Sequence, residues 1–327
     1  MIVTKTPLRI SFFGGGSDIP QFYNRHDGIT ISTTIDKHIY IAANDCVAKH
    51  IKLVYSEMEY PKNVDEIKHD RVREILKYAG ITSNIEIASF SDVPTKGTGL
   101  GSSSTFTVGV LNALSNIYDL PYNKRDLAEI ACHIEIDKCN EPIGKQDQYA
   151  AAFGGFNVIR YNKDYVSVTP VPIGISTLNK LQNNLFAYNT GINRQASTIL
   201  STQVNNLNTS IDTFNDTVAM TEIADRALKY LIKNDVDSFG SILDETWKMK
   251  KKLSSNISNI MIDRMYDDGI NAGAIGGKLL GAGGGGYMLF YVPEEKHYSF
   301  AKYMIQYERF KFNFVEYGST VEMHSVG

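Results

Sequence analysis

The sequence contains few cysteines, no long apolar run and no dense cluster of positive charge. Its three cysteines, Cys46, Cys132 and Cys139, are an odd, scattered set, so they do not form the disulfide framework of a small secreted domain. The longest apolar runs, such as residues 287–292, are far too short to span a bilayer. The first residues lack the charged and then apolar stretch of a secretory signal. We therefore expect a cytoplasmic protein with reduced thiols and no membrane partner.

Positive charge is not in excess either. Lys and Arg number 33 against 36 Asp and Glu, which gives a net charge of −3 with His neutral. Proteins that bind nucleic acids normally carry a basic patch or stripe, so we expect no nucleic-acid partner. A compact anion such as a nucleoside triphosphate needs only a local positive site and is compatible with this balance. The 327 residues are enough for two domains, each with its own core.

The hydrophobic pattern predicts short strands and helices without regular alternation. Runs rich in Ile, Phe and Thr favour strands, whereas apolar residues three or four positions apart favour helices. This mixture is typical of a two-layer α+β fold. The segment 164–178, which contains Pro170 and Pro172, is expected to connect the domains. The predicted strands are 8–13, 29–43, 51–55, 85–89, 276–280, 287–292 and 312–317, and the predicted helices are 64–78, 104–118, 124–139, most of 194–269, and 296–305.

The most informative segment is residues 94–104, Pro-Thr-Lys-Gly-Thr-Gly-Leu-Gly-Ser-Ser-Ser. Glycine permits positive φ and lets a ligand approach the backbone, and serine favours the start of a helix. Because free N–H groups and the helix dipole attract anions there, the segment predicts a site for a magnesium-bound triphosphate, with a serine hydroxyl free to reach the metal. The alternative is a tight loop that only caps a helix. So many glycines cost stability unless the backbone needs them, which disfavours that alternative.

Two familiar nucleotide motifs do not explain the glycines. The common P-loop needs Gly-x-x-x-x-Gly-Lys-Ser/Thr, and no window fits it. Residues 281–286 do match Gly-x-Gly-x-x-Gly, but the run that follows, 287–292, has the pattern of a strand. A dinucleotide site needs a helix at that place, so a nicotinamide enzyme is disfavoured.

Two further glycine clusters lie near the ends of the chain. Residues 6–18 run from a strand into Gly14–Gly16 and then Ser17 and Asp18, where the carboxylate can accept hydrogen bonds from sugar hydroxyls. The alternative for this segment is a turn with a capping Ser or Asp. The cluster in residues 277–286 is either a tight hairpin or, more often, close packing of the backbone on a ligand or on another loop.

Together, the three segments resemble the GHMP kinases, which include galactokinase, homoserine kinase, mevalonate kinase and phosphomevalonate kinase. Residues 94–104 are similar to that family's phosphate loop and 281–286 to its third motif, and the likeness runs from near residue 5 to the end. Within the family the sequence resembles the heptose 7-phosphate kinases. That likeness rests on Pro-Leu-Arg-Ile-Ser-Phe from Pro7, Gly-Lys-Gln-Asp-Gln-Tyr-Ala-Ala from Gly144, Thr-Gly-Ile-x-Arg from Thr190, and Trp-x-x-Lys-Lys from Trp247.

The resemblance implies a two-domain α+β fold and an ATP-dependent reaction. The N-terminal domain, 1–175, would resemble a ribosomal-protein domain, and the C-terminal domain, 176–327, would be ferredoxin-like. The implied activity is phosphorylation of the C1 hydroxyl of D-glycero-D-manno-heptose 7-phosphate, with ATP and Mg²⁺, in the synthesis of nucleotide-activated heptose for surface polysaccharide. A kinase of a free sugar such as fucose or galactose, a kinase of an isoprenoid precursor, and an inactive binding protein of this fold remain alternatives. A homodimer is compatible with all of them.

The resemblance also assigns roles to single residues. Asp147 would accept or orient the proton of the attacking hydroxyl, and Arg9 would stabilise charge on the transferred phosphoryl group. Ser103 and Glu135 would be the magnesium ligands. Each of these side chains has a plain alternative, namely a capping Asp, a surface Arg, a helix-start Ser and a solvated Glu. The phosphate loop would bind ATP through Lys96, Gly97, Gly99, Leu100, Gly101, Ser102, Ser103 and Ser104.

A phosphorylated substrate needs a second anion site. Arginine binds phosphate through a bidentate fork and lysine as a point charge, which makes Arg194 and the run Lys250–Lys252 the candidates. The lysine run is equally compatible with a solvated helix face. The residues predicted to contact the substrate are Gly15, Gly16, Ser17, Asp18, Gln146, Arg194, Lys251, Gly283 and Gly284.

Overall fold

Two β-sheets organise the chain in the computed structural model, which describes residues 1–94, 97–193, 196–254 and 256–324. In these residues the larger sheet has nine strands in the order β13-β1-β2-β5-β3-β4, with β12 and β6 paired to β2 and β7 paired to β6. Its strands are β1 (Ile2–Phe13), β2 (Gly28–Asp45), β3 (Ile51–Val54), β4 (Met58–Glu59), β5 (Ile85–Ser91), β6 (Phe156–Tyr161), β7 (Val166–Pro170), β12 (Phe314–Val315) and β13 (Thr320–His324).

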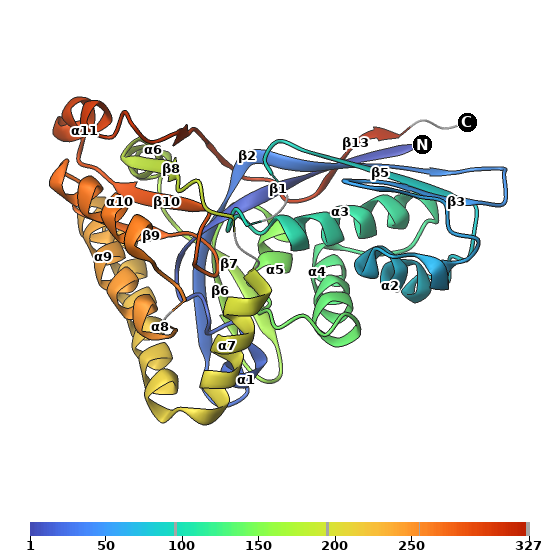
Figure 1. Cartoon of the computed structure of the whole chain (residues 1–327), viewed down its shortest axis with the longest axis horizontal. Coiled ribbons are helices and arrows are strands. Elements are labelled where there is room, and N and C mark those ends of the chain that lie inside the picture. The colour runs from blue at the N-terminus through green and yellow to red at the C-terminus, as the bar shows by residue number, and fades with distance from the viewer. Residues whose placement is uncertain (95–96, 194–195, 255, 325–327) are drawn as a thin grey trace.

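The long antiparallel pair β1–β2 forms the centre of the larger sheet. Residues 6–13 of β1 are all buried, because helices cover the sheet on both faces. The chain forms two lobes, the first built on this larger sheet and the second on a smaller sheet. One face of the larger sheet carries α3 (Ser102–Ile117) and α5 (Gln146–Phe153) (Figure 1). The helix α8 (Ile211–Ile232), which belongs to the second lobe, also contacts β1 and β2. The register shifts between Pro7 and Leu8 through a bulge in β2, where Asp36 and Lys37 have no partner residue on β1. Arg9 follows directly after this bulge.

Of the remaining helices of the first lobe, α2 (Asp70–Tyr78) and α4 (Lys124–Cys132) contact α3, whereas α1 (Pro20–Tyr23) contacts α7 (Ala196–Thr209). The first lobe also has a 3₁₀ turn at Val64–Glu66 and a π-helical turn at His133–Lys138. The predicted helix 64–78 therefore begins later than expected, at Asp70. His69 ends the preceding extended segment, and its side chain accepts a hydrogen bond from the N–H of Val72.

The smaller sheet, with the strand order β11-β8-β10-β9, forms the centre of the second lobe (Figure 1). Helices α9 and α10 pack closely on β10 through glycines. A Cβ atom at Gly240 of α9 would lie 2.2 Å from the ring of Tyr291, and one at Gly269 of α10 would lie 2.2 Å from that of Phe290. The elements are α6 (Ile175–Asn183), β8 (Leu185–Asn189), α7 (Ala196–Thr209), α9 (Val236–Lys252), α10 (Ile260–Asn271), β9 (Gly276–Leu279), β10 (Tyr287–Tyr291), a 3₁₀ turn (Glu294–Lys296), α11 (His297–Tyr303) and β11 (Arg309–Phe310).

The end of the chain returns to the first lobe. The chain crosses between β7 and α6, close to the predicted connection at 164–178. However, β12 pairs with β2 and β13 pairs with β1, so the two termini lie side by side (Figure 1). The predicted second domain, 176–327, thus gives its last strands to the larger sheet, where β13 covers the edge of β1 that would otherwise be unpaired. In the described part of the chain, none of the helices combines the length and hydropathy that crossing a membrane requires.

Candidate active site

An arginine and a carboxylate meet at the start of α5. The guanidinium of Arg9 donates from Nε to Oδ1 of Asp147 at 2.7 Å and from Nη2 to Oδ2 at 2.8 Å. This bidentate geometry fixes the orientation of the carboxylate. The side chain of Asp147 remains 27% exposed, whereas that of Arg9 is only 5% exposed. The structure therefore brings the two predicted catalytic residues together and leaves the carboxylate accessible.

The predicted phosphate loop packs directly against Arg9 and Asp147. Gly97, Gly99 and Gly101 have φ values of 75°, 74° and 79°, and Gly101 is the N-cap of α3. Left-handed residues alternating with other conformations direct successive N–H groups to one side, as in anion-binding nests. Arg9 is tied to the loop as well, because its Nη1 donates to the carbonyl of Gly99 at 2.6 Å and its N–H to that of Leu100 at 3.0 Å.

The third glycine cluster packs on the phosphate loop. A Cβ atom at Gly281 would lie 2.3 Å from Cα of Gly99, and one at Gly99 would lie 2.4 Å from the carbonyl oxygen of Leu280. The cluster connects the antiparallel strands β9 and β10, as expected of a hairpin, and it also packs closely on another loop, as the other expectation has it. The two glycines predicted to contact substrate pack on the segment after α9, since the N–H of Gly284 donates to Ile257 O at 2.8 Å and Gly283 lies against the same residue.

Asp18, which lies far from α5 in the sequence, hydrogen-bonds to the first residue of that helix. Its Oδ1 accepts from the N–H of Gly16 at 2.9 Å and its Oδ2 from that of Gln146 at 3.1 Å. Burial raises the pKa of Asp18, and the charge of Asp147 adds to the effect, while the hydrogen bonds from the two N–H groups oppose it. Gln146 in turn accepts from the hydroxyl of Ser11 at 2.7 Å. The predicted substrate residues Asp18 and Gln146 thus lie beside Asp147.

Gly16 and Ser17, the two residues before Asp18, make contacts within the protein. Ser17 is fully buried, and its hydroxyl donates to Gly14 O at 2.7 Å and accepts from the N–H of Ile29 at 3.0 Å. It therefore shapes the turn and does not face a ligand. Gly16 lies against Gln203 of α7, a buried side chain that sequence reasoning missed. Gly15 is partly exposed and has no close neighbour where its side chain would be.

Glu135 is fully buried and all four acceptor positions of its carboxylate are used. Its Oε1 accepts from Arg71 Nε and Thr107 Oγ1 at 2.9 Å each, and its Oε2 from Ser104 Oγ at 2.7 Å and Gln148 Nε2 at 2.6 Å. The other predicted metal ligand, Ser103, is exposed on α3, and it is Ser104 that contacts Glu135.

A resident magnesium ion does not fit this arrangement of Glu135, because it would have to displace protein donors from the carboxylate. Arg71, which also pairs with Glu141, already offsets part of the charge that would attract the ion. The Ser103–Glu135 metal site therefore stays a prediction.

Within the run Lys250–Lys252, Lys250 is the residue directed toward the glycine loops of the candidate site. Lys251 pairs with Asp263 at 3.2 Å and lies over the ring of Trp247, so it is a half-exposed helix-face residue. Lys250 is buried, and its Nζ donates to the carbonyls of Gly281 and Leu279. Burial, together with the charge of Arg9, lowers the pKa of Lys250 to about 7. The predicted residues Lys96 and Arg194 lie outside the described residues.

Lys278 is a functional candidate to which sequence reasoning gave no role. It lies on β9, is 3% exposed, and donates from Nζ to Ser11 O at 3.0 Å and Phe12 O at 2.7 Å. Burial, with the charges of Lys250 and Arg9, lowers its pKa well below the ordinary value. A lysine next to the glycine cluster inside an otherwise apolar strand was the signal that could have identified it. It joins the second lobe to the strand that carries Arg9.

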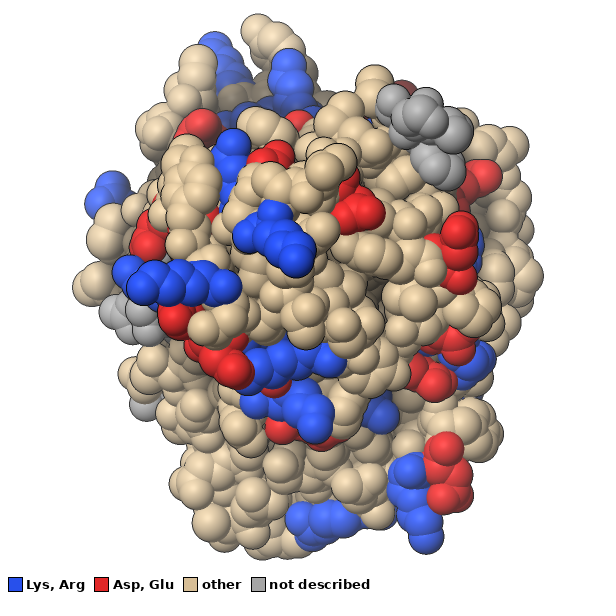
Figure 2. Space-filling view, turned by 90° about the vertical axis from the view of Figure 1, so that its right-hand side faces the viewer, with Lys and Arg blue, Asp and Glu red and all other residues tan. Residues whose placement is uncertain are grey.

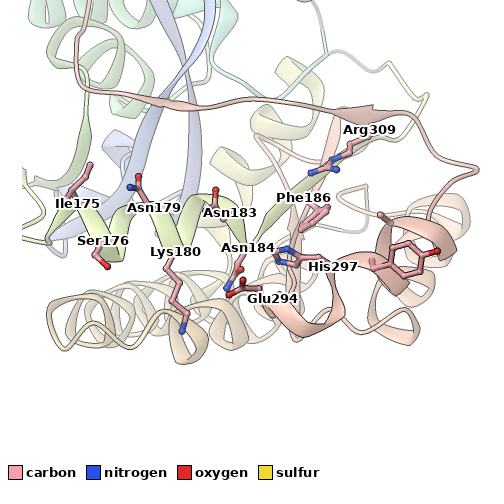
Figure 3. Close-up of a pocket in the computed structure, with 12 residues that line it drawn as sticks. Ile175, Ser176, Asn179, Lys180, Asn183, Asn184, Phe186, Glu294, His297 and Arg309 are labelled. Carbon is pink, nitrogen blue, oxygen red and sulfur yellow. The ribbon is translucent and has the colours of Figure 1, made fainter.

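A separate hollow of about 900 Å³ lies between α6, β8 and α11 (Figure 3). Side chains of α6, among them Asn179 and Lys180, line one side, and Phe186, His297 and Arg309 line the other. None of the predicted site residues in the described part of the chain lines it. It is therefore distinct from the Arg9–Asp147 site.

Known proteins are similar to this chain over nearly its whole length. Residues 67–155 match the family model of the GHMP kinase N-terminal domain. The chain is 32% identical to a D-glycero-alpha-D-manno-heptose 7-phosphate kinase of Campylobacter jejuni, over 92% of both proteins. Among solved structures it superposes on a D-glycero-D-manno-heptose 1-phosphate kinase of Bacteroides thetaiotaomicron with a TM-score of 0.80 and 25% identity, covering 99% of this chain and 100% of that one. A putative sugar kinase of Campylobacter jejuni gives a TM-score of 0.78 at 29% identity, covering 98% and 97%.

The fold and the site define an enzyme that transfers a phosphoryl group. The chain belongs to the GHMP kinase family and is an ATP-dependent phosphotransferase whose relatives include sugar kinases. The predicted family and its mixed α/β fold are confirmed.

Proposed function

We propose that this kinase phosphorylates the C1 hydroxyl of D-glycero-D-manno-heptose 7-phosphate and produces the 1,7-bisphosphate for nucleotide-activated heptose. The observation that carries the proposal is the accessible Asp147 carboxylate, held by Arg9 below a glycine loop, in a chain similar throughout to a heptose 7-phosphate kinase. Magnesium would enter as the MgATP complex, and the exposed hydroxyl of Ser103, in the first turn of α3, would be its candidate protein ligand.

The geometry supports a direct transfer. The C1 oxygen attacks the γ-phosphorus, the bond from that phosphorus to the bridging oxygen breaks, and ADP leaves. Asp147 orients the hydroxyl and accepts its proton, and Arg9 keeps the carboxylate in place. The N–H groups of the glycine loop and the nearby cations stabilise the negative charge of the triphosphate. Positioning and charge stabilisation dominate such reactions because the transition state is loose.

A coupled assay of ADP release tests the acceptor. We expect turnover with the 7-phosphorylated heptose and at least tenfold lower kcat/KM with unphosphorylated heptose, mannose, galactose and fucose. Asp147→Asn should lower kcat by about 10²–10⁴-fold, the usual contribution of general base catalysis. Equal or better turnover of a free sugar would contradict the proposed acceptor. Full activity of Asp147→Asn would contradict the proposed role of the carboxylate.

A further inference from the structure

Three metal-ligating side chains meet at an end of the larger sheet that is remote from the active site. Sγ of Cys46 lies 3.9 Å from Nε2 of His50, and that nitrogen lies 2.8 Å from Oε1 of Glu86. The three ligand atoms all lie within 4.8 Å of one another. Cys46 follows the far end of β2, whereas Arg9 pairs with Thr34 in the middle of that strand. The cluster is therefore not part of the phosphate site.

Backbone hydrogen bonds hold the cluster together independently of its side chains. The N–H of Cys46 donates to Asn84 O at 2.9 Å, and the N–H of Ile85 donates to His50 O at 3.2 Å. Both ends of the Cys46–His50 turn are thus tied to the beginning of β5, which carries Glu86. A site whose ligands are positioned by the framework loses little entropy when it binds an ion.

The ligand set has the chemistry of a zinc site with one open position. Zn²⁺ binds thiolate sulfur, imidazole nitrogen and carboxylate oxygen at about 2.0–2.3 Å in a tetrahedron, which places ligand atoms roughly 3.3–3.7 Å apart. The observed separations of 2.8 and 3.9 Å lie on either side of that range, so small side-chain rotations suffice.

Charge and access also favour a cation at this place. In the described part of the chain no Lys or Arg forms an ion pair with Glu86, whose partner is His50. All three side chains are part-buried, which leaves an open side for a water ligand. Figure 2 shows that this end of the molecule carries acidic and basic side chains interspersed, without a basic patch that would repel a cation.

We propose that Cys46, His50 and Glu86 bind a divalent zinc-type ion that ties the β2–β3 connection to β5. Binding replaces the thiol proton: the Cys46 S–H bond, which donates to Ala48 O, is exchanged for a sulfur–metal bond and one proton is released. In the hydrogen bond to the Glu86 carboxylate, Nε2 of His50 carries the proton. When Nε2 binds the ion, that proton moves to Nδ1 of the same ring, so the imidazole stays neutral, and the carboxylate binds without losing a proton.

Cobalt titration of the chelator-treated full-length protein tests the site. Co²⁺ bound to a thiolate in a tetrahedral site gives a sulfur-to-metal charge-transfer band and intense visible bands, whereas Co²⁺ on a nucleotide gives neither. We expect these bands to saturate at one equivalent and to be removed by Zn²⁺. Cys46→Ser should abolish the charge-transfer band and weaken Zn²⁺ binding by at least about 100-fold, since even outer-shell changes cost 10–100-fold.

Matched variants make the test decisive. Cys139→Ser, which alters another part-buried free cysteine, should retain the bands, and Glu86→Gln should weaken binding while keeping the charge-transfer band at high Co²⁺. Zn²⁺ should raise the melting temperature of the wild type and of Cys139→Ser only. Absence of the bands from the folded wild type, or bands that survive Cys46→Ser, would overturn the proposal. Kinase kcat should be unchanged in Cys46→Ser because the site lies apart from Asp147.

Discussion

At the scale of single residues, the Arg9 fork is the contact on which the active-site geometry depends. Lysine cannot make two parallel hydrogen bonds, so Arg9→Lys should leave the Asp147 carboxylate free to rotate and the carbonyl of Gly99 without its donor. We expect kcat to fall by about 10²-fold, as small misplacements of reacting groups cost that much, with a smaller change in KM for the sugar. Steady-state kinetics would measure this. Arg160→Lys, at an exposed pair with Asp225, is the control and should change nothing. An unaltered kcat in Arg9→Lys would mean that catalysis does not depend on the two hydrogen bonds from Arg9 to Asp147.

The second residue-scale prediction concerns the protonation of Lys250. Its pKa of about 7 in the folded protein is below the ordinary 10.5, so unfolding between those pH values takes up a proton. The free energy of unfolding should therefore rise with pH from about 7 to 10, with a slope of up to about 1.4 kcal/mol per pH unit from this group. Urea unfolding at several pH values would show a shallower slope in Lys250→Met than in the wild type. Lys251→Met, which removes the exposed neighbour, should keep the wild-type slope, and equal slopes in all three proteins would refute the prediction.

At the scale of elements, the π-helical turn after α4 places Glu135 among donors from three helices. Arg71 comes from α2, Ser104 and Thr107 from α3, and Gln148 from α5. A π turn inserts an extra residue into a helix and re-aims the side chains that follow, which is why such turns occur at functional sites. Here it turns a carboxylate into the interior, where it joins the helices that carry the phosphate loop and Asp147.

Glu135→Gln separates this clamp from a role as metal ligand. If the clamp matters most, the part-buried Arg71 keeps Glu141 but loses its second carboxylate partner, and the buried donors around Glu135 lose a charged acceptor, so the protein should lose about 2 kcal/mol of stability. The dependence of kcat on Mg²⁺ should then stay close to that of the wild type. Urea unfolding and a magnesium titration measure the two effects, with Glu129→Gln on the exposed face of α4 as the control. A stable variant that needs tenfold more Mg²⁺ would restore the original prediction of a metal ligand.

Elements with a strong local pattern were predictable, and those that depend on distant partners were not. The helices near 104–118 and 124–139 were confirmed as α3 and as α4 with its π turn, because their apolar faces are visible in the sequence. In contrast, α5 was not predicted. Its N-cap is Lys145, which has no capping hydrogen bond, and the N–H of Gln146 is satisfied by Asp18, which lies far away in the sequence. Likewise, the mostly exposed β13 is a strand only because the edge of β1 is there to pair with it.

At the scale of the whole molecule, the candidate active site lies beside the contact between the two lobes. The sequence predicted the phosphate loop, Arg9 and Asp147 as parts of one site, since glycine spacing and family likeness are local features, and the structure brings the three together. The sequence could not show that Lys278 reaches back to β1 or that Gly281 packs on Gly99, because these contacts join residues far apart in the chain. The phosphate loop comes from one lobe, and the loop around Gly281 that packs on it comes from the other. We therefore expect the distance between the lobes to set the shape of the triphosphate site.

Gly281→Ala tests whether that contact controls catalysis. Gly281 and Gly80 have nearly the same positive φ, 70° and 69°, so alanine at either position should cost about 1 kcal/mol of stability through backbone strain. Only at Gly281 does the added Cβ meet another loop, at 2.3 Å from Gly99, whereas nothing lies within 4 Å of it at Gly80. We therefore expect Gly80→Ala to retain full activity and Gly281→Ala to lose at least tenfold in kcat/KM for ATP, measured at saturating sugar. Equal kinetics in both variants would show that the lobes tolerate a wider separation, whereas a loss confined to Gly281→Ala would locate ATP recognition at the seam between the two loops.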